Sequence, residues 1–123
     1  MTIHPRILIV DDNRDELQML RTALKGRFEV LEASDGFDAY ALACAERPAA
    51  IVLDIAMPVV DGWTVLRKLR TNPSTKDIPV VIFTALELEP VRHEARTLNV
   101  QAIIRKPTPT RELEAAIRRA LAA

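Results

Sequence analysis

A run of apolar residues that ends abruptly in one acid constrains the fold of this chain more than any other feature. Residues 49–53 are all apolar, and Asp54 follows them directly. Short continuous apolar runs of this kind are typical of strands buried on both faces, which occur inside parallel sheets. Pro58 fixes its own φ and disfavours a helical conformation at Met57, so a loop is predicted after Asp54. We therefore expect Asp54 at the carboxyl end of a central strand, held rigidly and partly shielded from water.

The rest of the chain alternates similar apolar runs with segments of helical periodicity. Leu17, Leu20 and Leu24, for example, recur at the spacing of one face of a helix. Alternation of this kind predicts an α/β fold, a doubly wound parallel sheet with helices on both faces joined by right-handed crossovers. The expected strands are 6–10, 28–33, 49–53, 79–83 and 101–104; the expected helices are 13–25, 36–47, 62–71, 87–98 and a last one from 108 or 110 almost to the C-terminus.

The fourth helix has the weakest pattern of the five. Its expected span, 87–98, contains Pro90, which a helix tolerates only in its first turn. Asn99 is expected to adopt the left-handed conformation that ends the helix.

Length and composition limit the classes of protein to consider. The chain has 123 residues, so we expect one domain, 1–123, with one core. Seventeen basic and seventeen acidic residues cancel, so no net charge attracts the chain to nucleic acid or to an anionic membrane. No apolar stretch is long enough to cross a bilayer. The single cysteine, Cys44, cannot form an internal disulfide, which suits a reducing compartment, and a cytoplasmic location is expected.

Polar residues stand where four of the expected strands end. They are Asp11 and Asp12 after the first strand, Asp54 after the third, Thr84 after the fourth and Lys106 after the fifth. In an open parallel sheet the working site lies beyond the carboxyl ends of the strands. A single polar residue at such a place marks only the emergence of a strand into solvent, whereas five together indicate a site.

These residue types suit phosphoryl transfer that depends on a divalent cation. Three clustered carboxylates repel one another, and a hard cation such as Mg²⁺, which prefers oxygen ligands, relieves the repulsion. Lys106 and Thr84 would offer a positive charge and a hydroxyl donor to phosphoryl oxygens. Asp54 would then be a nucleophile that forms an acyl phosphate, with the protein supplying position and charge neutralisation.

At these residues the sequence resembles the receiver domain of two-component response regulators. The resemblance covers essentially the whole chain, in the order and spacing of its elements. Each motif is weak alone, but the ordered set is specific. The matching motifs are Asp11-Asp12, Asp54-x-x-Met57-Pro58-x-x-Asp61-Gly62, Thr84-Ala85 and Lys106-Pro107.

The resemblance implies a fold and a role for each site residue. The fold would be flavodoxin-like, with five parallel strands in the order 2-1-3-4-5. Asp54 would accept a phosphoryl group, while Asp12 and Asp54 bind Mg²⁺ by side chain. Asp11 would act mainly through a metal-bound water, and the backbone carbonyl of Ala56 would complete the protein ligands.

The resemblance also assigns the groups that contact the phosphoryl oxygens. Thr84 and Lys106 would bind them by side chain, and the backbone N–H groups of Ala56 and Ala85 would help. The Lys106–Pro107 peptide bond is expected to be cis.

The partners that the resemblance implies are proteins. A histidine kinase or a histidine phosphotransfer protein would donate the phosphoryl group, docking beside the first helix. A downstream protein would bind the face formed by the fourth helix, the fifth strand and the fifth helix. We expect a stand-alone regulator, a monomer or weak dimer, that catalyses only its own phosphorylation and dephosphorylation and is not an enzyme for other substrates.

Three positions depart from the pattern of the family. Ile103 stands where many receivers carry an aromatic residue that turns inward on activation, so a switch based on loop and helix shifts is favoured here. In relatives, the side chains two residues after the phosphoacceptor and two after the threonine flank the path of the water that hydrolyses the acyl phosphate. Here they are Ala56 and Leu86, and neither can orient a water by hydrogen bonding. We expect slow self-dephosphorylation.

Two other classes of protein are alternatives to a receiver domain. A phosphatase with an aspartate nucleophile needs a second acid two residues later, but Asp54 is followed by Ile-Ala and Asp11 by Asp-Asn. A flavin-binding electron carrier needs a phosphate loop rich in Ser, Thr and Gly after the first strand, where this chain has acids. The phosphatase is the closer alternative.

Overall fold

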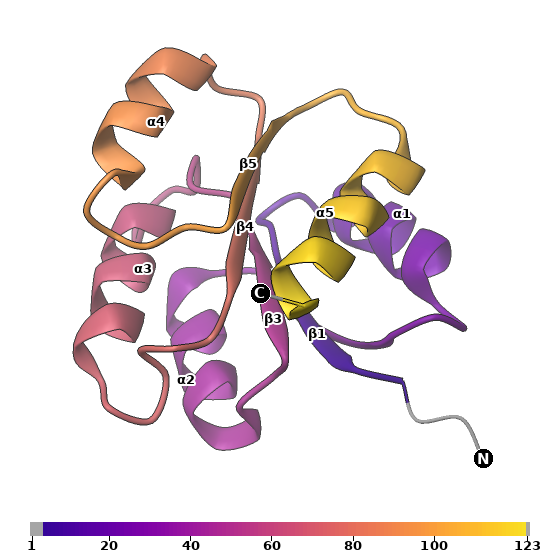
Figure 1. Cartoon of the computed structure of the whole chain (residues 1–123), viewed down its shortest axis with the longest axis horizontal. Coiled ribbons are helices and arrows are strands. Elements are labelled where there is room, and N and C mark those ends of the chain that lie inside the picture. The colour runs from indigo at the N-terminus through magenta and orange to yellow at the C-terminus, as the bar shows by residue number, and fades with distance from the viewer. Residues whose placement is uncertain (1–3, 123) are drawn as a thin grey trace.

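The computed structural model describes residues 4–122 as a five-stranded parallel sheet alternating with five helices (Figure 1). The strand order is β2-β1-β3-β4-β5, and every adjacent pair is parallel, which confirms the expected fold class. The elements are β1 (Arg6–Val10), α1 (Arg14–Leu24), β2 (Glu29–Ala33), α2 (Gly36–Glu46), β3 (Ala50–Leu53), α3 (Gly62–Thr71), β4 (Val80–Thr84), α4 (Leu88–Ala95), β5 (Ala102–Arg105) and α5 (Thr110–Ala122).

Helices cover both faces of the sheet. In Figure 1 the sheet is seen nearly edge-on, with α1 and α5 on one side and α2, α3 and α4 on the other. Two separate groups of buried side chains fill the two layers, one under each set of helices. Strands β3 and β4 are buried along their whole length, which explains why both read as unbroken apolar runs.

Side-chain caps fix the starts of three helices close to the sheet edge. Asn13 accepts hydrogen bonds from the backbone N–H groups of Asp15 and Glu16, and so caps α1. Asp35 caps α2 and Asp61 caps α3 in the same way. These caps satisfy N–H groups that a helix leaves unpaired, and they set where each loop from the sheet ends.

The fourth helix is shorter than the sequence predicts. It ends at Ala95 rather than 98, and residues 96–99 form turns. Two i→i+3 contacts replace the α-helical pattern there, from Arg96 N–H to His93 C=O and from Leu98 N–H to Ala95 C=O. Asn99 does take the left-handed conformation, with φ of 53°, but it ends this turn segment rather than the helix itself.

The other expected boundaries differ from the observed ones by at most one residue. Thr84 is the last residue of β4 rather than the first after it, and β5 ends at Arg105. The fifth helix starts at Thr110, the later of the two expected positions. The Lys106–Pro107 bond is cis, as the resemblance implies. Within residues 4–122, no helix combines the length and apolar character needed to span a bilayer.

Candidate functional site

Two backbone hydrogen bonds carry the sheet one residue past its strands and so position two acids. The N–H of Asp54 donates to Val10 C=O at 3.0 Å, and the N–H of Asp11 donates to Ala33 C=O at 3.2 Å. Both residues therefore belong to the rigid sheet rather than to free loops. Their side chains emerge at the same edge because the strands are parallel and in register, with Val10 opposite Leu53.

Three carboxylates meet at this edge. One side-chain oxygen from each of Asp11, Asp12 and Asp54 lies within 4.8 Å of the other two. Asp11 and Asp54 are buried, with 2% and 7% of their surface exposed, while Asp12 is exposed at the rim. The donor set consists only of oxygens, which fits a hard divalent cation. The structure brings together the three acids that the sequence singled out.

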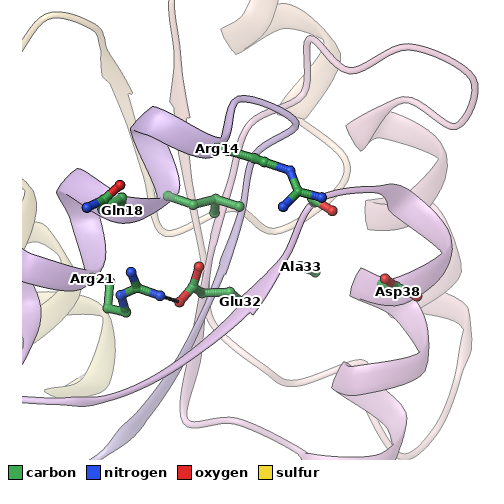
Figure 2. A pocket seen from close by; sticks show the side chains of 8 residues that line it. Arg14, Gln18, Arg21, Glu32, Ala33 and Asp38 are labelled. Carbon is green, nitrogen blue, oxygen red and sulfur yellow. Dashed lines mark hydrogen bonds and ion pairs between the residues drawn. The ribbon is translucent and has the colours of Figure 1, made fainter.

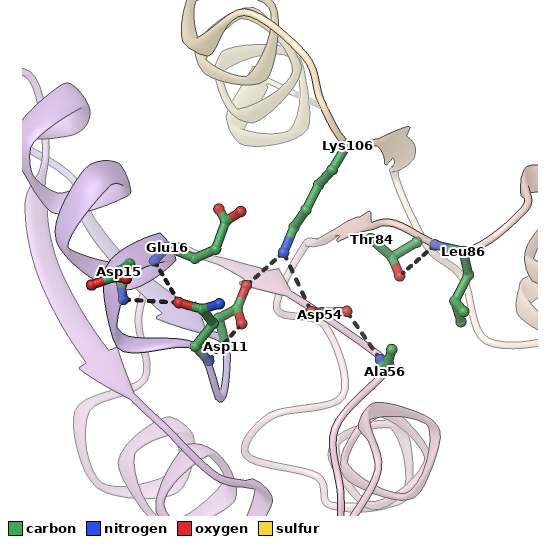
Figure 3. A network of polar contacts seen from close by, with 9 residues as sticks. Asp11, Asp15, Glu16, Asp54, Ala56, Thr84, Leu86 and Lys106 are labelled. Atoms are coloured by element: carbon green, nitrogen blue, oxygen red, sulfur yellow. Dashed lines mark hydrogen bonds and ion pairs between the residues drawn. The ribbon is translucent and has the colours of Figure 1, made fainter.

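Lys106 reaches into the cluster from the end of β5. Its Nζ atom donates to Asp11 Oδ2 at 2.6 Å and to Asp54 Oδ2 at 3.3 Å, as Figure 3 shows. The same atom lies 5.3 Å from the centroid of the Phe83 ring, in cation–π contact. Lys106 thus offsets part of the repulsion between the buried carboxylates.

The surroundings of Lys106 shift its pKa in opposite directions. Burial disfavours the charged amine and acts to lower the pKa, but the hydrogen bond to Asp11 and the negative charges of Asp54, Asp11 and Glu16 outweigh it. The net result is a pKa above the ordinary value of 10.5. Lys106 therefore carries a full positive charge at neutral pH.

Thr84 lies at the same edge but outside this network. It is fully buried, and its Oγ1 accepts a hydrogen bond from the N–H of Leu86 at 3.3 Å. Among the described residues, no hydrogen bond joins its hydroxyl to Asp54 or Lys106. Figure 3 shows Thr84 turned towards the loop after β4 rather than towards the acids.

The loop after Asp54 folds back under the carboxylate. The N–H of Ala56 donates to Asp54 Oδ1 at 3.0 Å, which fixes the orientation of the side chain. The N–H of Gly62 donates to Ile55 C=O at 3.1 Å, so the start of α3 lies directly against the loop. Asp61 therefore caps α3, and Gly62 allows the backbone of α3 to approach the backbone of Ile55 closely.

Sequence reasoning missed one acid of the network, Glu16. It comes from the first turn of α1, and its charge contributes to the raised pKa of Lys106. Its Oε2 atom is buried without a hydrogen-bond partner within the described residues. The sequence feature that could have identified Glu16 is its position, one helical turn after Asp12 and next to the inward-facing Leu17.

A separate hollow of about 380 Å³ lies between α1, the end of β2 and α2 (Figure 2). Arg21 and Glu32 form an ion pair across it at 2.8 Å, and Arg14 and Asp38 line it further along. Its charges are balanced, and none of the residues predicted for the site lines it.

The sequence also matches a known protein family. The family model for the response regulator receiver domain matches residues 7–118. The chain belongs to this family. The match includes every residue that the geometry places at the acidic edge.

Among individual relatives of this receiver domain, the response regulator PleD of Caulobacter vibrioides is 46% identical over 83 residues. The aligned part is 67% of this chain but only 18% of PleD, so the chain spans under a fifth of that protein.

Solved structures agree with the family. A putative response regulator from Chloroflexus aurantiacus has a TM-score of 0.91 and 28% identity, covering 98% of this chain and 100% of that one. The receiver domain of a sensor histidine kinase from Pseudomonas aeruginosa has a TM-score of 0.89 and 25% identity, with the same coverage. That structure holds a magnesium ion in its active-site cleft.

Proposed function

We propose that Asp54 accepts a phosphoryl group and that the resulting charge switches the contacts of this receiver domain with other proteins. The observation that carries the proposal is the position of Asp54: a buried carboxylate fixed by Ala56, paired with Lys106 and flanked by two further acids. A carboxylate oxygen of Asp54 would attack phosphorus, the bond from phosphorus to the donor nitrogen would break, and that nitrogen would keep the bonding electron pair.

Asp11, Asp12, Asp54 and the backbone carbonyl of Ala56 would hold Mg²⁺. The ion, when bound, supplies positive charge that offsets the carboxylates and the incoming phosphoryl oxygens. The support is the all-oxygen cluster within 4.8 Å and the magnesium ion in the related Pseudomonas receiver. Asp11 already accepts hydrogen bonds from Lys106 and from the N–H of Asn13, which suits an indirect role through a metal-bound water.

Lys106 and Thr84 would bind the phosphoryl oxygens. Lys106 is charged and already within 3.3 Å of Asp54, so it needs little movement. Thr84 must rotate its side chain, and the rotation breaks the hydrogen bond that its Oγ1 accepts from the N–H of Leu86. The loop that leads into α4 would shift as a result. In this proposal the partly buried Ile103 on β5 takes no part in the step, and the switch works by movement of the loop.

The proposed partners are a histidine kinase or histidine phosphotransfer protein as donor, and a downstream protein on the face of α4, β5 and α5. The proposed setting is the cytoplasm, and the proposed unit is the whole of residues 1–123. The domain would turn over only its own aspartyl phosphate. The family match lends no support to the alternative of an aspartate-nucleophile phosphatase.

Incubation with acetyl phosphate and Mg²⁺ tests the proposal by intact-mass measurement. The wild type should gain the mass of one phosphoryl group, and Asp54→Asn should gain none. Asp61→Asn is the matched control, because Asp61 is an exposed acid of the next helix cap and should leave phosphorylation intact. Equal labelling of the wild type and Asp54→Asn would show that another residue is the acceptor.

A further inference from the structure

One buried oxygen beside the acidic site has no hydrogen-bond partner. It is Oε2 of Glu16, and within residues 4–122 it is the one buried side-chain nitrogen or oxygen atom without a partner. Buried polar atoms in native proteins are nearly always paired, because an unpaired one has lost its contacts with water and gained nothing in return. A partner that reaches Glu16 in another state of the protein would explain this exception.

The start of α1 directs Glu16 towards Lys106. The backbone N–H of Glu16 donates to Oδ1 of the cap residue Asn13 at 3.2 Å, and the next residue, Leu17, is buried in the core. Figure 3 shows the Glu16 side chain reaching out from α1 towards Lys106, and its charge contributes to the raised pKa of that lysine. Arg14, from the same turn, lines the hollow between α1 and α2 instead (Figure 2).

The ammonium group of Lys106 has one donor to spare. A lysine ammonium carries three N–H donors. Two of them are used, by Asp11 Oδ2 at 2.6 Å and by Asp54 Oδ2 at 3.3 Å, and the described residues offer no third acceptor within hydrogen-bond distance. Only 13% of the Lys106 side chain is exposed, so an ammonium that lost these two contacts would need another acceptor close by.

We propose that Glu16 is a positioning residue, which accepts the ammonium of Lys106 when Asp11 and Asp54 turn to other partners. Its Oε2 would pair with the spare N–H and keep the amine beside position 54, within reach of phosphoryl oxygens. No proton moves in this step, and Glu16 stays charged throughout. The inference rests on the proposed function for the events that draw the two acids away, but the contact itself needs neither metal nor phosphorylation.

Two other roles for Glu16 are distinguishable from this one. A carboxylate that ligates the cation, or that acts only through its electric field, needs its negative charge above all. A carboxylate that holds the amine needs an acceptor at the right distance from α1. Glu16→Gln keeps the length and an acceptor without the charge, whereas Glu16→Asp keeps the charge on a side chain one carbon shorter.

NMR of the protein labelled with ¹³C-lysine, in EDTA, tests the contact. Lysine occurs only at positions 25, 68, 76 and 106, so the Lys106 signals are assigned by their loss in Lys106→Met. The base variant is Asp11→Ala with Asp54→Ala, which removes both present partners of the amine and leaves Glu16. If circular dichroism shows that this pair does not fold, Asp11→Asn with Asp54→Asn takes its place, since it keeps the shape of both side chains.

In the base variant we expect a through-space signal between Hε of Lys106 and Hγ of Glu16. The two Hε protons should also give separate resonances, as they do in a fixed side chain. Addition of Glu16→Met or Glu16→Asp should merge them, and addition of Glu16→Gln should keep them separate. Asp15→Asn is the matched control: it removes an exposed acid from the same helical turn, with the same loss of interaction with the helix dipole, and should change nothing.

A rate measurement with Asp54 in place tests the consequence. If acetyl phosphate and Mg²⁺ phosphorylate Asp54 as proposed, Glu16→Met should slow the reaction by about tenfold, because the amine is no longer held in position. Glu16→Gln should slow it by less than about threefold. Asp15→Asn should react at the wild-type rate.

Four results would overturn the inference: no signal between Lys106 and Glu16 in the base variant, separate Hε resonances that survive Glu16→Met, resonances kept by Glu16→Asp but merged by Glu16→Gln, or an unchanged rate in Glu16→Met. The NMR base variant has no carboxylate at position 54, so its outcome does not depend on whether Asp54 accepts a phosphoryl group. Failure of the mass test would therefore count against the proposed function alone.

Discussion

Gly62 and Ile55 approach so closely that a Cβ atom on Gly62 would lie 2.4 Å from the Cα of Ile55. The atom it would meet is backbone, which cannot move aside as a flexible side chain can. We expect Gly62→Ala to lower the free energy of unfolding by about 2–3 kcal/mol, the usual cost of overpacking. Urea denaturation followed by circular dichroism measures it.

Gly26→Ala is the comparison for that variant. Gly26 has φ of 91°, and a Cβ atom added there would meet no other atom within 4 Å, so the cost is conformational only, about 1 kcal/mol. A smaller loss for Gly62→Ala than for Gly26→Ala would contradict the steric argument.

Val59 adopts a backbone conformation that suits its side chain poorly. It is β-branched, has φ of 66° and is 97% exposed, so no packing compensates for the strain. We expect Val59→Asn to raise the free energy of unfolding by about 1 kcal/mol, because Asn tolerates the left-handed region. Thermal and urea unfolding measure the change. Val60→Asn serves as control and should destabilise, since Val60 packs against the core.

The raised pKa of Lys106 gives the stability of the metal-free protein a pH dependence. A lysine whose pKa is higher in the folded state stabilises the fold fully below its ordinary pKa of 10.5 and ceases to do so as the pH rises through the raised value. In EDTA, the wild type should therefore lose its stability advantage over Lys106→Met as the pH rises above 10.5 and through the raised pKa of Lys106. Lys76→Met is an exposed lysine control. Parallel curves for the wild type and Lys106→Met would refute the prediction.

Removal of the Asp12 carboxylate should stabilise the metal-free protein and abolish its response to magnesium. Asp12→Asn relieves repulsion with Asp11 and Asp54, so we expect the metal-free variant to be more stable by about 0.5–1 kcal/mol, a modest amount because Asp12 is exposed. Addition of MgCl₂ should raise the melting temperature of the wild type but not of this variant. Asp15→Asn, an exposed acid outside the cluster, should respond to MgCl₂ like the wild type. A magnesium response retained in Asp12→Asn would argue against the proposed ligand set.

Leu86 should govern how long the aspartyl phosphate lasts. It is 43% exposed and apolar, so it cannot orient an attacking water. If Asp54 is phosphorylated as proposed, Leu86→Asn should shorten the phosphate lifetime by roughly tenfold, about 1.4 kcal/mol in the barrier. Leu86→Val keeps the apolar character and should change little. Decay of the phosphorylated mass over time measures both, and an unchanged lifetime in Leu86→Asn would exclude the effect.

The sequence was sufficient to predict the sheet and the gathering of the acids because burial determines both. Strands β3 and β4 have no solvent-exposed face, so each is a continuous apolar run in the sequence. The acids of the cluster follow directly after buried strands. The cap residues Asn13, Asp35 and Asp61 are equally local signals. Each lies immediately before its helix and bonds to N–H groups within three residues.

Features set by long-range contact could not be predicted. The early end of α4 depends on the turn at 96–99, where Arg70 from α3 donates to the carbonyls of Leu98 and Asn99 at 2.7 and 3.0 Å. The place of Glu16 beside Lys106 depends on how α1 lies against the sheet. The state of Thr84 depends on Leu86, a loop residue with no pattern of its own.

Lys106 and Asp11 are separated by 95 positions in the chain, yet a hydrogen bond of 2.6 Å joins their side chains. During synthesis the acids at the ends of β1 and β3 emerge long before the lysine. Until β5 has been added to the sheet, these carboxylates would lack the counter-charge of Lys106. If Asp54 accepts a phosphoryl group as proposed and needs Lys106 to do so, competence to react would report that β5 has docked beside β4.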